Sequence, residues 1–160
     1  MDRLNQILRN KSYREYYNKI EKAEADRSFC LHDIQHFLAV ARIAMLLNLQ
    51  ENLQIKQEFI YITAILHDIG RFEQYENGTP HEKASVILAE PILHESGFND
   101  EEISIILEAI DNHRNKEVVG TGTLNDIIYR ADKMSRNCFL CKMYQECNWK
   151  QDKKNDSLIL

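Results

Sequence analysis

The chain has 160 residues, 44% apolar and 28% charged, and its 5 glycines and 2 prolines are too few for the turns of many short strands. Its net charge of −5, from 25 acidic and 20 basic residues, excludes a global basic surface for a nucleic-acid polymer. No segment approaches the roughly 18 consecutive apolar residues of a membrane span, and no basic stretch followed by an apolar run opens the chain. We therefore expect a single all-α domain in the cytoplasm with no membrane partner; the oligomeric state stays open.

The first half of the chain predicts three helices. Residues 3–25 are charged and tyrosine-rich with an imperfect apolar stripe, which is typical of an outer helix. In residues 32–49 the apolar stripe, followed backwards in steps of four, reaches His36 and His32, so both imidazoles are expected on the buried face. Residues 56–68 are apolar almost all round, as in a helix that others enclose.

The second half predicts three more helices, each with one polar residue in phase with its apolar side chains. Residues 80–96 begin with a proline and place His81 in phase with the stripe. The next helix opens with an acidic first turn, and its apolar stripe continues to His113. In a last long helix, from about 124 to 145, the step of four from the apolar stripe lands on Asp132.

Five separate elements are thus expected to point an imidazole or a carboxylate inward. The central helix contributes one of each, because it ends in a His-Asp doublet. The set comprises His36, His67, Asp68, His81, His113 and Asp132. Taken singly, each could be a hydrogen-bonded core residue, and Asp132 could pair with Arg130 or Lys133. Together they would need several independent buried polar pairs, whereas one or two divalent cations would satisfy them all. Nitrogen and oxygen ligands of this kind suit iron, manganese, nickel and zinc.

The order of these residues resembles the HD-domain superfamily of metal-dependent phosphohydrolases in its six-ligand form. Three local contexts carry the resemblance: D-x-x-H-x-x-x-V around His36, L-H-D-I-G around His67 and R-A-D-K around Asp132. The resemblance covers residues 30–136 and leaves a cysteine-containing extension at 137–160. It implies an HD-domain helical bundle of about six to seven helices, with residues 1–160 forming one domain.

The resemblance also implies roles for the six residues. One metal would be held by His36, His67, Asp68 and Asp132, and a second by His81 and His113, with Asp68 bridging the two as the catalytic carboxylate. The cofactor would be one or two divalent ions, drawn from Fe, Mn, Ni, Co, Zn or Mg. Two cations about 4 Å apart can activate a water and neutralise phosphoryl oxygens without a separate protein base.

Phosphate recognition requires cations beside the metals, and four basic residues lie close to the ligands in sequence. They are Arg71, Arg114, Lys133 and Arg136, which could line one mouth or form a solvated rim. The sequence H-D-I-G-R-F-E lacks the acidic pair of guanosine-polyphosphate hydrolases, and the G-Y-P signature of cyclic-dinucleotide phosphodiesterases is absent. The chain is similar in size and ligand order to small bacterial nucleotide phosphohydrolases. We therefore expect a nucleotide or a related small phosphate ester as substrate, hydrolysed by a metal-activated water.

Two other functions share this ligand pattern. Di-iron oxygenases such as the inositol oxygenases use the same six-ligand arrangement, and a non-catalytic metal or nucleotide sensor would retain it as well. The role of His32 is also open, because it could ligate, bind substrate or pack.

Four cysteines form a second pattern. Cys138, Cys141 and Cys147 are spaced as C-x2-C-x5-C, and Cys30 precedes the helix of His36. Three thiols leave one tetrahedral position of a zinc ion open, which Cys30 could fill. Such a metal would tie the C-terminal extension to the core. The alternative is that all four are reduced thiols packed as small apolar groups.

Overall fold

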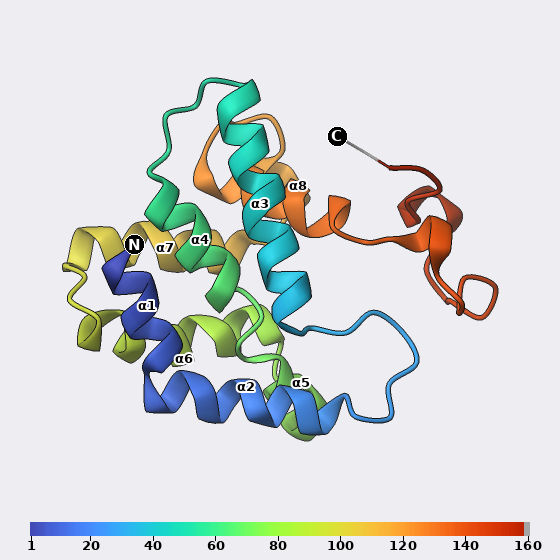
Figure 1. Cartoon of the computed structure of the whole chain (residues 1–160), viewed down its shortest axis with the longest axis horizontal. Helices are drawn as coiled ribbons and strands as arrows, with labels where there is room; N and C mark the ends of the chain where they lie inside the picture. Colours follow the sequence, from blue (N-terminus) through green and yellow to red (C-terminus); the bar gives the residue numbers. More distant parts are fainter. Residues whose placement is uncertain (159–160) are drawn as a thin grey trace.

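The computed structural model describes residues 1–158, which contain eight α-helices, three short 3-10 helices and no strand (Figure 1). The α-helices are α1 (Asp2–Arg9), α2 (Lys11–Ala23), α3 (Ile34–Gln50), α4 (Gln57–Leu66), α5 (Arg71–Asn77), α6 (His81–Glu95), α7 (Asp100–Asn112) and α8 (Leu124–Met134), and the 3-10 helices are η1 (Lys116–Val118), η2 (Cys138–Leu140) and η3 (Gln151–Lys153). The all-α prediction is confirmed. The last two residues of the predicted extension, 159 and 160, lie outside the described residues.

The N-terminal region holds two helices where the sequence predicted one. Asn10 leaves the helical conformation, with ψ at 133°, and its side chain accepts a hydrogen bond from the backbone N–H of Tyr13 at 3.1 Å. It thereby ends α1 and caps α2. Ile7 and Ile20, one from each helix, are almost fully buried, so both helices keep an apolar face on the core.

The bundle is built around α4. This helix packs against α3, α7 and α8. At most 1% of the surface is exposed at four of its residues, Ile60, Ile62, Ile65 and Leu66. Figure 1 shows α4 enclosed in this way, with α3 and α8 on one side of it and α7 on another. The predicted central helix is therefore confirmed, and its C-terminal end lies deep in the molecule.

The turn after α4 depends on Gly70. Its φ of −88° is open to any residue, but an added Cβ would lie 2.5 Å from the backbone nitrogen of Ser85 and 2.7 Å from the carbonyl carbon of Ala84. Its own N–H donates to the Ser85 hydroxyl at 2.9 Å. Glycine thus allows the turn that carries the His-Asp doublet to lie directly against α6.

The last α-helix is shorter than predicted, because α8 ends at Met134 and not near residue 145. The next apolar side chains, Phe139 and Leu140, are 36% and 80% exposed, so a longer helix would have had no apolar face to bury. The side-chain amide of Asn155 instead donates to the carbonyls of Lys133 at 2.9 Å and Arg136 at 2.8 Å. Residues 137–158, which we call the C-terminal segment, lie beside the bundle at the right of Figure 1.

No helix in the described part of the chain is long and apolar enough to cross a membrane.

Candidate metal centre

The six residues of the predicted ligand set meet at one place, and all of them lie at or near helix ends. They are His36 in the first turn of α3, His67 and Asp68 directly after α4, His81 at the start of α6, His113 directly after α7, and Asp132 in the last turn of α8. A side chain at a helix end can point along the axis into a space that several helices share. The five elements therefore bring their polar groups together without breaking the apolar packing between helices.

The six side chains form two groups that could each hold an ion. In one group His36, His67 and Asp132 place their ligand atoms within 4.8 Å of one another, and in the other Asp68, His81 and His113 do so. The Nε2 atom of His36 lies 3.5 Å from Oδ1 of Asp132. The Nε2 atoms of His81 and His113 are 3.1 Å apart.

The carboxylate of Asp68 lies between the two groups. Its Oδ1 is 3.1 Å from Nε2 of His81 and 3.5 Å from Nε2 of His113. Its Oδ2 is 3.2 Å from Nε2 of His67 and 3.7 Å from Nε2 of His36. Each oxygen thus faces a different group, which is the arrangement a bridging carboxylate requires; the individual ligand roles stay predictions.

Backbone carbonyls hold two of the imidazoles in the tautomer that a metal needs. Nδ1 of His67 donates to the carbonyl of Ala64 at 2.7 Å, and Nδ1 of His113 donates to that of Ile110 at 2.6 Å. These carbonyls belong to the last turns of α4 and α7, where helix carbonyls lack an internal partner. With the proton on Nδ1, the Nε2 lone pair of each ring points at the centre.

Buried polar atoms at the centre fit a cation. His67 is fully buried and Asp68 and His113 are 3% and 1% exposed. Nε2 of His36, Nε2 of His67 and Oδ1 of Asp68 are buried without a hydrogen-bond partner. An unpaired buried polar group costs on the order of 1–3 kcal/mol, and a divalent ion would engage all three atoms. The donor set therefore fits one or two divalent metal ions.

Charges at the centre also suit metal binding. Burial alone would raise the pKa of Asp68, but the surrounding imidazoles, His67 and His32 foremost, hold it well below its usual range. Burial would likewise raise the pKa of Asp132, and Lys133 and His67 lower it instead. Burial lowers the pKa of His81. Ionised carboxylates at Asp68 and Asp132 and a neutral imidazole at His81 are the protonation states in which these three residues ligate.

A pair that the sequence did not reveal, a buried glutamate with a partly buried histidine, adjoins the centre. His32 precedes α3 and does not lie on it; its Nδ1 is 2.5 Å from Oε1 of Glu24, and its Nε2 is 3.8 Å from Oδ2 of Asp68. The other oxygen of Glu24 accepts the backbone N–H of His32 at 2.7 Å. Burial would raise the pKa of Glu24, but the hydrogen bonds and charge of His32, together with a hydrogen bond from Tyr75, outweigh it, so the pKa is lowered and the carboxylate stays charged. Periodicity could not find Glu24, since it is the residue directly after α2 and lies outside the apolar stripe of that helix.

The four basic residues occupy different surroundings. Nη1 of Arg71 lies 2.7 Å from Nδ1 of His81, and the same Nδ1 is 2.5 Å from Oε1 of Gln74, a neighbour that sequence reasoning also missed. Lys133 pairs with Asp132, so Arg71 and Lys133 each contact a different ligand group.

Arg114 and Arg136 lie farther out. Arg114 is 51% exposed and pairs with Glu82 at 3.2 Å. The guanidinium of Arg136 stacks on Trp149 at 4.3 Å and lines a cavity that His36 also borders. The structure therefore sets Arg71 and Lys133 beside the centre, while Arg114 and Arg136 contact other partners.

Comparison with known proteins adds to this geometry. Residues 33–137 match the family described as HD domain. The chain belongs to the HD-domain family. It is 51% identical, over 97% of either chain, to an uncharacterized protein of Clostridium beijerinckii. Its fold is similar to the crystal structure of a predicted HD superfamily hydrolase from an uncultured Thermotogales bacterium, with 24% identity, a TM-score of 0.62 and coverage of 88% of this chain and 80% of the other. The resemblance read from the motifs is confirmed.

Proposed function

We propose that this HD-domain protein is a metal-dependent phosphohydrolase that acts on a nucleotide or a related small phosphate ester. The observation that carries the proposal is the position of the buried Asp68, whose two oxygens face two ligand groups. The printed description of the Thermotogales protein as a predicted hydrolase supports the same reaction class. The nucleotide part of the proposal depends on the similarity in size and ligand order to small bacterial phosphohydrolases.

Each ligand group would hold one ion. His36, His67 and Asp132 would bind the first, His81 and His113 the second, and Asp68 would contact both. When bound, divalent ions lower the pKa of a coordinated water and withdraw charge from phosphoryl oxygens. The residues of the chain keep this arrangement rigid, because the carbonyls of Ala64 and Ile110 fix the imidazole planes of His67 and His113.

Arg71 and Lys133 would bind the phosphate. Both lie beside a ligand group, and both carry hydrogen-bond donors that a phosphate oxygen could accept in place of their present partners. Their positive charges also attract an anionic substrate to an otherwise acidic protein. Arg71 offers two donors in a planar fork, whereas Lys133 acts as a point charge that can turn about its flexible stem.

Replacing Lys133 tests whether the substrate is a phosphate. A charged hydrogen bond is worth on the order of 1.5 to 3 kcal/mol, so Lys133→Ala should lower kcat/KM by roughly 10- to 150-fold on a phosphoester substrate. Metal content should change little, because Lys133 contacts Asp132 without belonging to either ligand group. Inorganic phosphate should compete with the substrate less strongly in the variant. Activity is measured in a nucleotide and phosphoester screen with Mn, Co, Ni and Mg.

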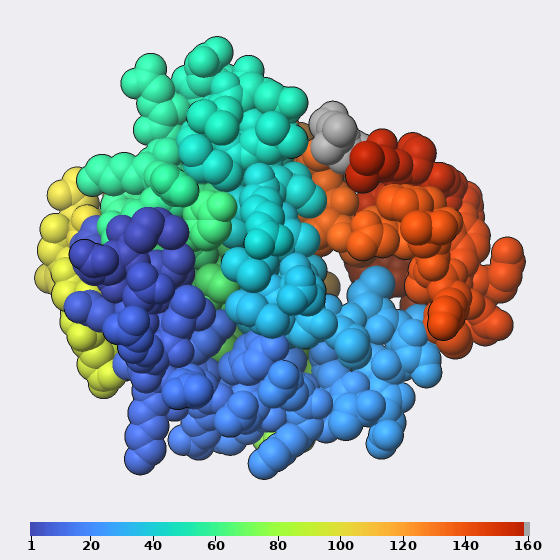
Figure 2. Space-filling view, in the orientation of Figure 1, coloured from blue at the N-terminus to red at the C-terminus, as the bar shows by residue number. Residues whose placement is uncertain are grey.

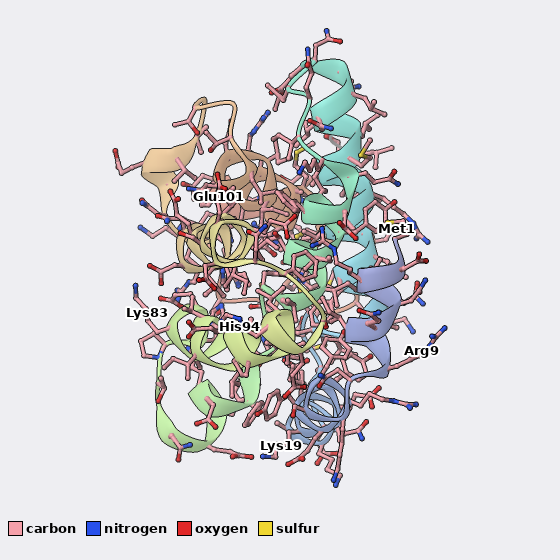
Figure 3. All side chains as sticks on the ribbon, turned by 90° about the vertical axis from the view of Figure 1, so that its left-hand side faces the viewer. Met1, Arg9, Lys19, Lys83, His94 and Glu101 are labelled. Atoms are coloured by element: carbon pink, nitrogen blue, oxygen red, sulfur yellow. The ribbon has the colours of Figure 1, made fainter. Side chains whose placement is uncertain are left out.

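Lys83→Ala is the matched control. Lys83 also pairs with an aspartate, Asp111 at 2.6 Å, but its side chain is 60% exposed and points outward from α6 at the edge of the bundle (Figure 3). Its removal should leave kcat/KM unchanged. If Lys133→Ala turns over phosphoesters as the wild type does, Lys133 belongs to the solvated surface. If the wild-type protein consumes oxygen and releases no phosphate, the oxygenase function replaces the proposed one.

A further inference from the structure

All four cysteines of the chain border one cavity. It has a volume of about 440 Å³ and lies between residues 28–31, the first turns of α3 and the C-terminal segment. Cys30 comes from the first of these walls and Cys138, Cys141 and Cys147 from the last. In Figure 2 a hollow opens between α3, in cyan, the loop before it, in blue, and the C-terminal segment, in orange. The fold thus brings together thiols that are more than 100 residues apart in sequence.

The C-terminal segment has no apolar core of its own. Among residues 137–158 only Asn155 is buried, and Leu140 and Trp149 are 80% and 45% exposed. The segment contains only the single-turn helices η2 and η3. Ordering about 20 residues costs on the order of 1 to 2 kcal/mol each, which burial of so little apolar surface does not offset. Small units of this kind are usually held by disulfides or by a metal.

The cysteines are the groups in this region best suited to hold it. They are four free thiols, three of them half-buried, and their arrangement as C-x2-C-x5-C plus one distant cysteine is a typical ligand pattern for thiolate-bound metals. Partial burial in the cavity wall, together with the thiols of Cys138 and Cys141, raises the pKa of the Cys30 thiol. Thiols gathered around one cavity ionise together only when a cation compensates their charge.

The surroundings supply part of that compensation. Arg136 and Lys154 line the same cavity. Four thiolates and one divalent ion carry a net charge of −2, since four negative charges meet two positive ones. The two side chains would offset it, as cations beside a metal site commonly do.

We propose that Cys30, Cys138, Cys141 and Cys147 form a second metal site, a four-thiolate site for a thiophilic centre, which is either one zinc ion or one iron–sulfur cluster. In the described residues no three thiol sulfurs lie within 4.8 Å of one another. A single zinc ion, with bonds of about 2.3 Å in a tetrahedron, needs sulfurs about 3.8 Å apart, so the loops would have to close on it. An iron–sulfur cluster places iron and sulfide atoms between its ligands and so needs its cysteine sulfurs farther apart than a single zinc ion does.

The site would link two parts of the molecule. The loop before α3 holds Cys30 and also His32, which contacts Asp68 at the metal centre. A metal bound by the four thiolates would therefore fix the C-terminal segment and this loop against each other.

The test compares the wild-type chain with Cys141→Ser and Cys30→Ser, all purified without oxygen and without added metal. Zinc, iron and acid-labile sulfide are counted per chain. In the wild type we expect either about one zinc ion that a thiol-modifying reagent releases, or about four iron atoms with a similar amount of sulfide and visible absorption, beyond any metal at the HD centre. Cobalt added to metal-depleted protein should give thiolate-to-cobalt charge-transfer absorption, which imidazole and carboxylate ligands do not produce.

Both cysteine variants should lose this metal and the cobalt signal, while far-ultraviolet circular dichroism shows that the bundle is folded. Lys142→Ser, an exposed neighbour of Cys141 outside the cavity wall, is the matched control and should keep both. The proposal is overturned if the folded wild type contains no zinc or sulfide and all four thiols react freely, or if the cysteines are found in disulfides. Retention of the metal by Cys30→Ser would overturn the four-thiolate assignment.

Discussion

The metal centre and the cysteine cavity are both clusters of potential ligands, yet the fold builds them differently. At the centre the ligands lie at helix ends, four of the six are at most 5% exposed, and two imidazoles are held by carbonyls of the helices that carry them. Around the cavity the cysteines lie on loops and at the start of the single-turn helix η2, and Cys30 is exposed. Packing of the bundle is therefore sufficient to form the first cluster, whereas the second needs its own ligand to become rigid.

The largest effect is expected at Asp68, because both ligand groups depend on it. Asp68→Ala should abolish activity and lower total metal content at the HD centre, whereas His113→Ala, which removes a ligand of one group, should leave about one ion bound. Metal analysis of the two variants measures the difference.

Retention of two ions by both variants would refute the division into two groups. Circular dichroism provides the control, since neither side chain belongs to the apolar core and the helical content should persist. Metal at the four-thiolate site, recognised by its thiolate absorption, should be the same in both variants.

The fold and the predicted ligands could be read from the sequence because they share one signal. Apolar side chains recur with the helical period, and His81, His113 and Asp132 continue that recurrence into the core. The helix boundaries were harder to predict from the sequence. Asn10 splits the first helix through a single side-chain hydrogen bond, and α8 ends early because nothing covers the apolar residues that follow it.

Contacts that arise only on folding could not be predicted. Glu24 and Gln74 lie 8 and 7 residues from the histidines they contact, at spacings that follow no regular element. The basic residues were predicted as one set because they are close to ligands in sequence. The structure separates them, since Arg71 and Lys133 lie on α5 and α8, whereas Arg114 and Arg136 follow the ends of α7 and α8.

Glu24 connects the metal centre with the cysteine cavity, because the loop before α3, which it holds through His32, borders both. Glu24→Gln keeps the size of the side chain but removes the charge that holds His32. We expect roughly a tenfold loss of kcat, as for other groups that orient residues around a metal, with metal content unchanged. Steady-state kinetics and metal analysis measure the two quantities.

The control is Glu15→Gln, on the α2 helix that precedes Glu24, whose side chain is 59% exposed and pairs with Lys19. It should leave kcat unchanged. An equal loss in both variants, or loss of metal in Glu24→Gln, would show that Glu24 does not act by orienting His32.

The smallest effect is expected at Asn155, which attaches the C-terminal segment to α8. Asn155→Ala removes the hydrogen bonds to the carbonyls of Lys133 and Arg136, at a local cost of about 1 kcal/mol. The unfolding midpoint of the bundle should hardly change, because the segment contributes no apolar core. Limited proteolysis and hydrogen exchange should instead show faster opening of residues 137–158.

Asn148→Ala, which replaces an exposed asparagine in the same segment, is the matched control for Asn155→Ala. The two variants should differ little in the opening rate of residues 137–158 while the four-thiolate site holds metal. They should differ more after chelation, because the metal and Asn155 restrain the same segment. If Asn155→Ala lowered the midpoint of the whole bundle as strongly as a core substitution, the segment would be part of the folded core and the contrast between the two clusters would fail.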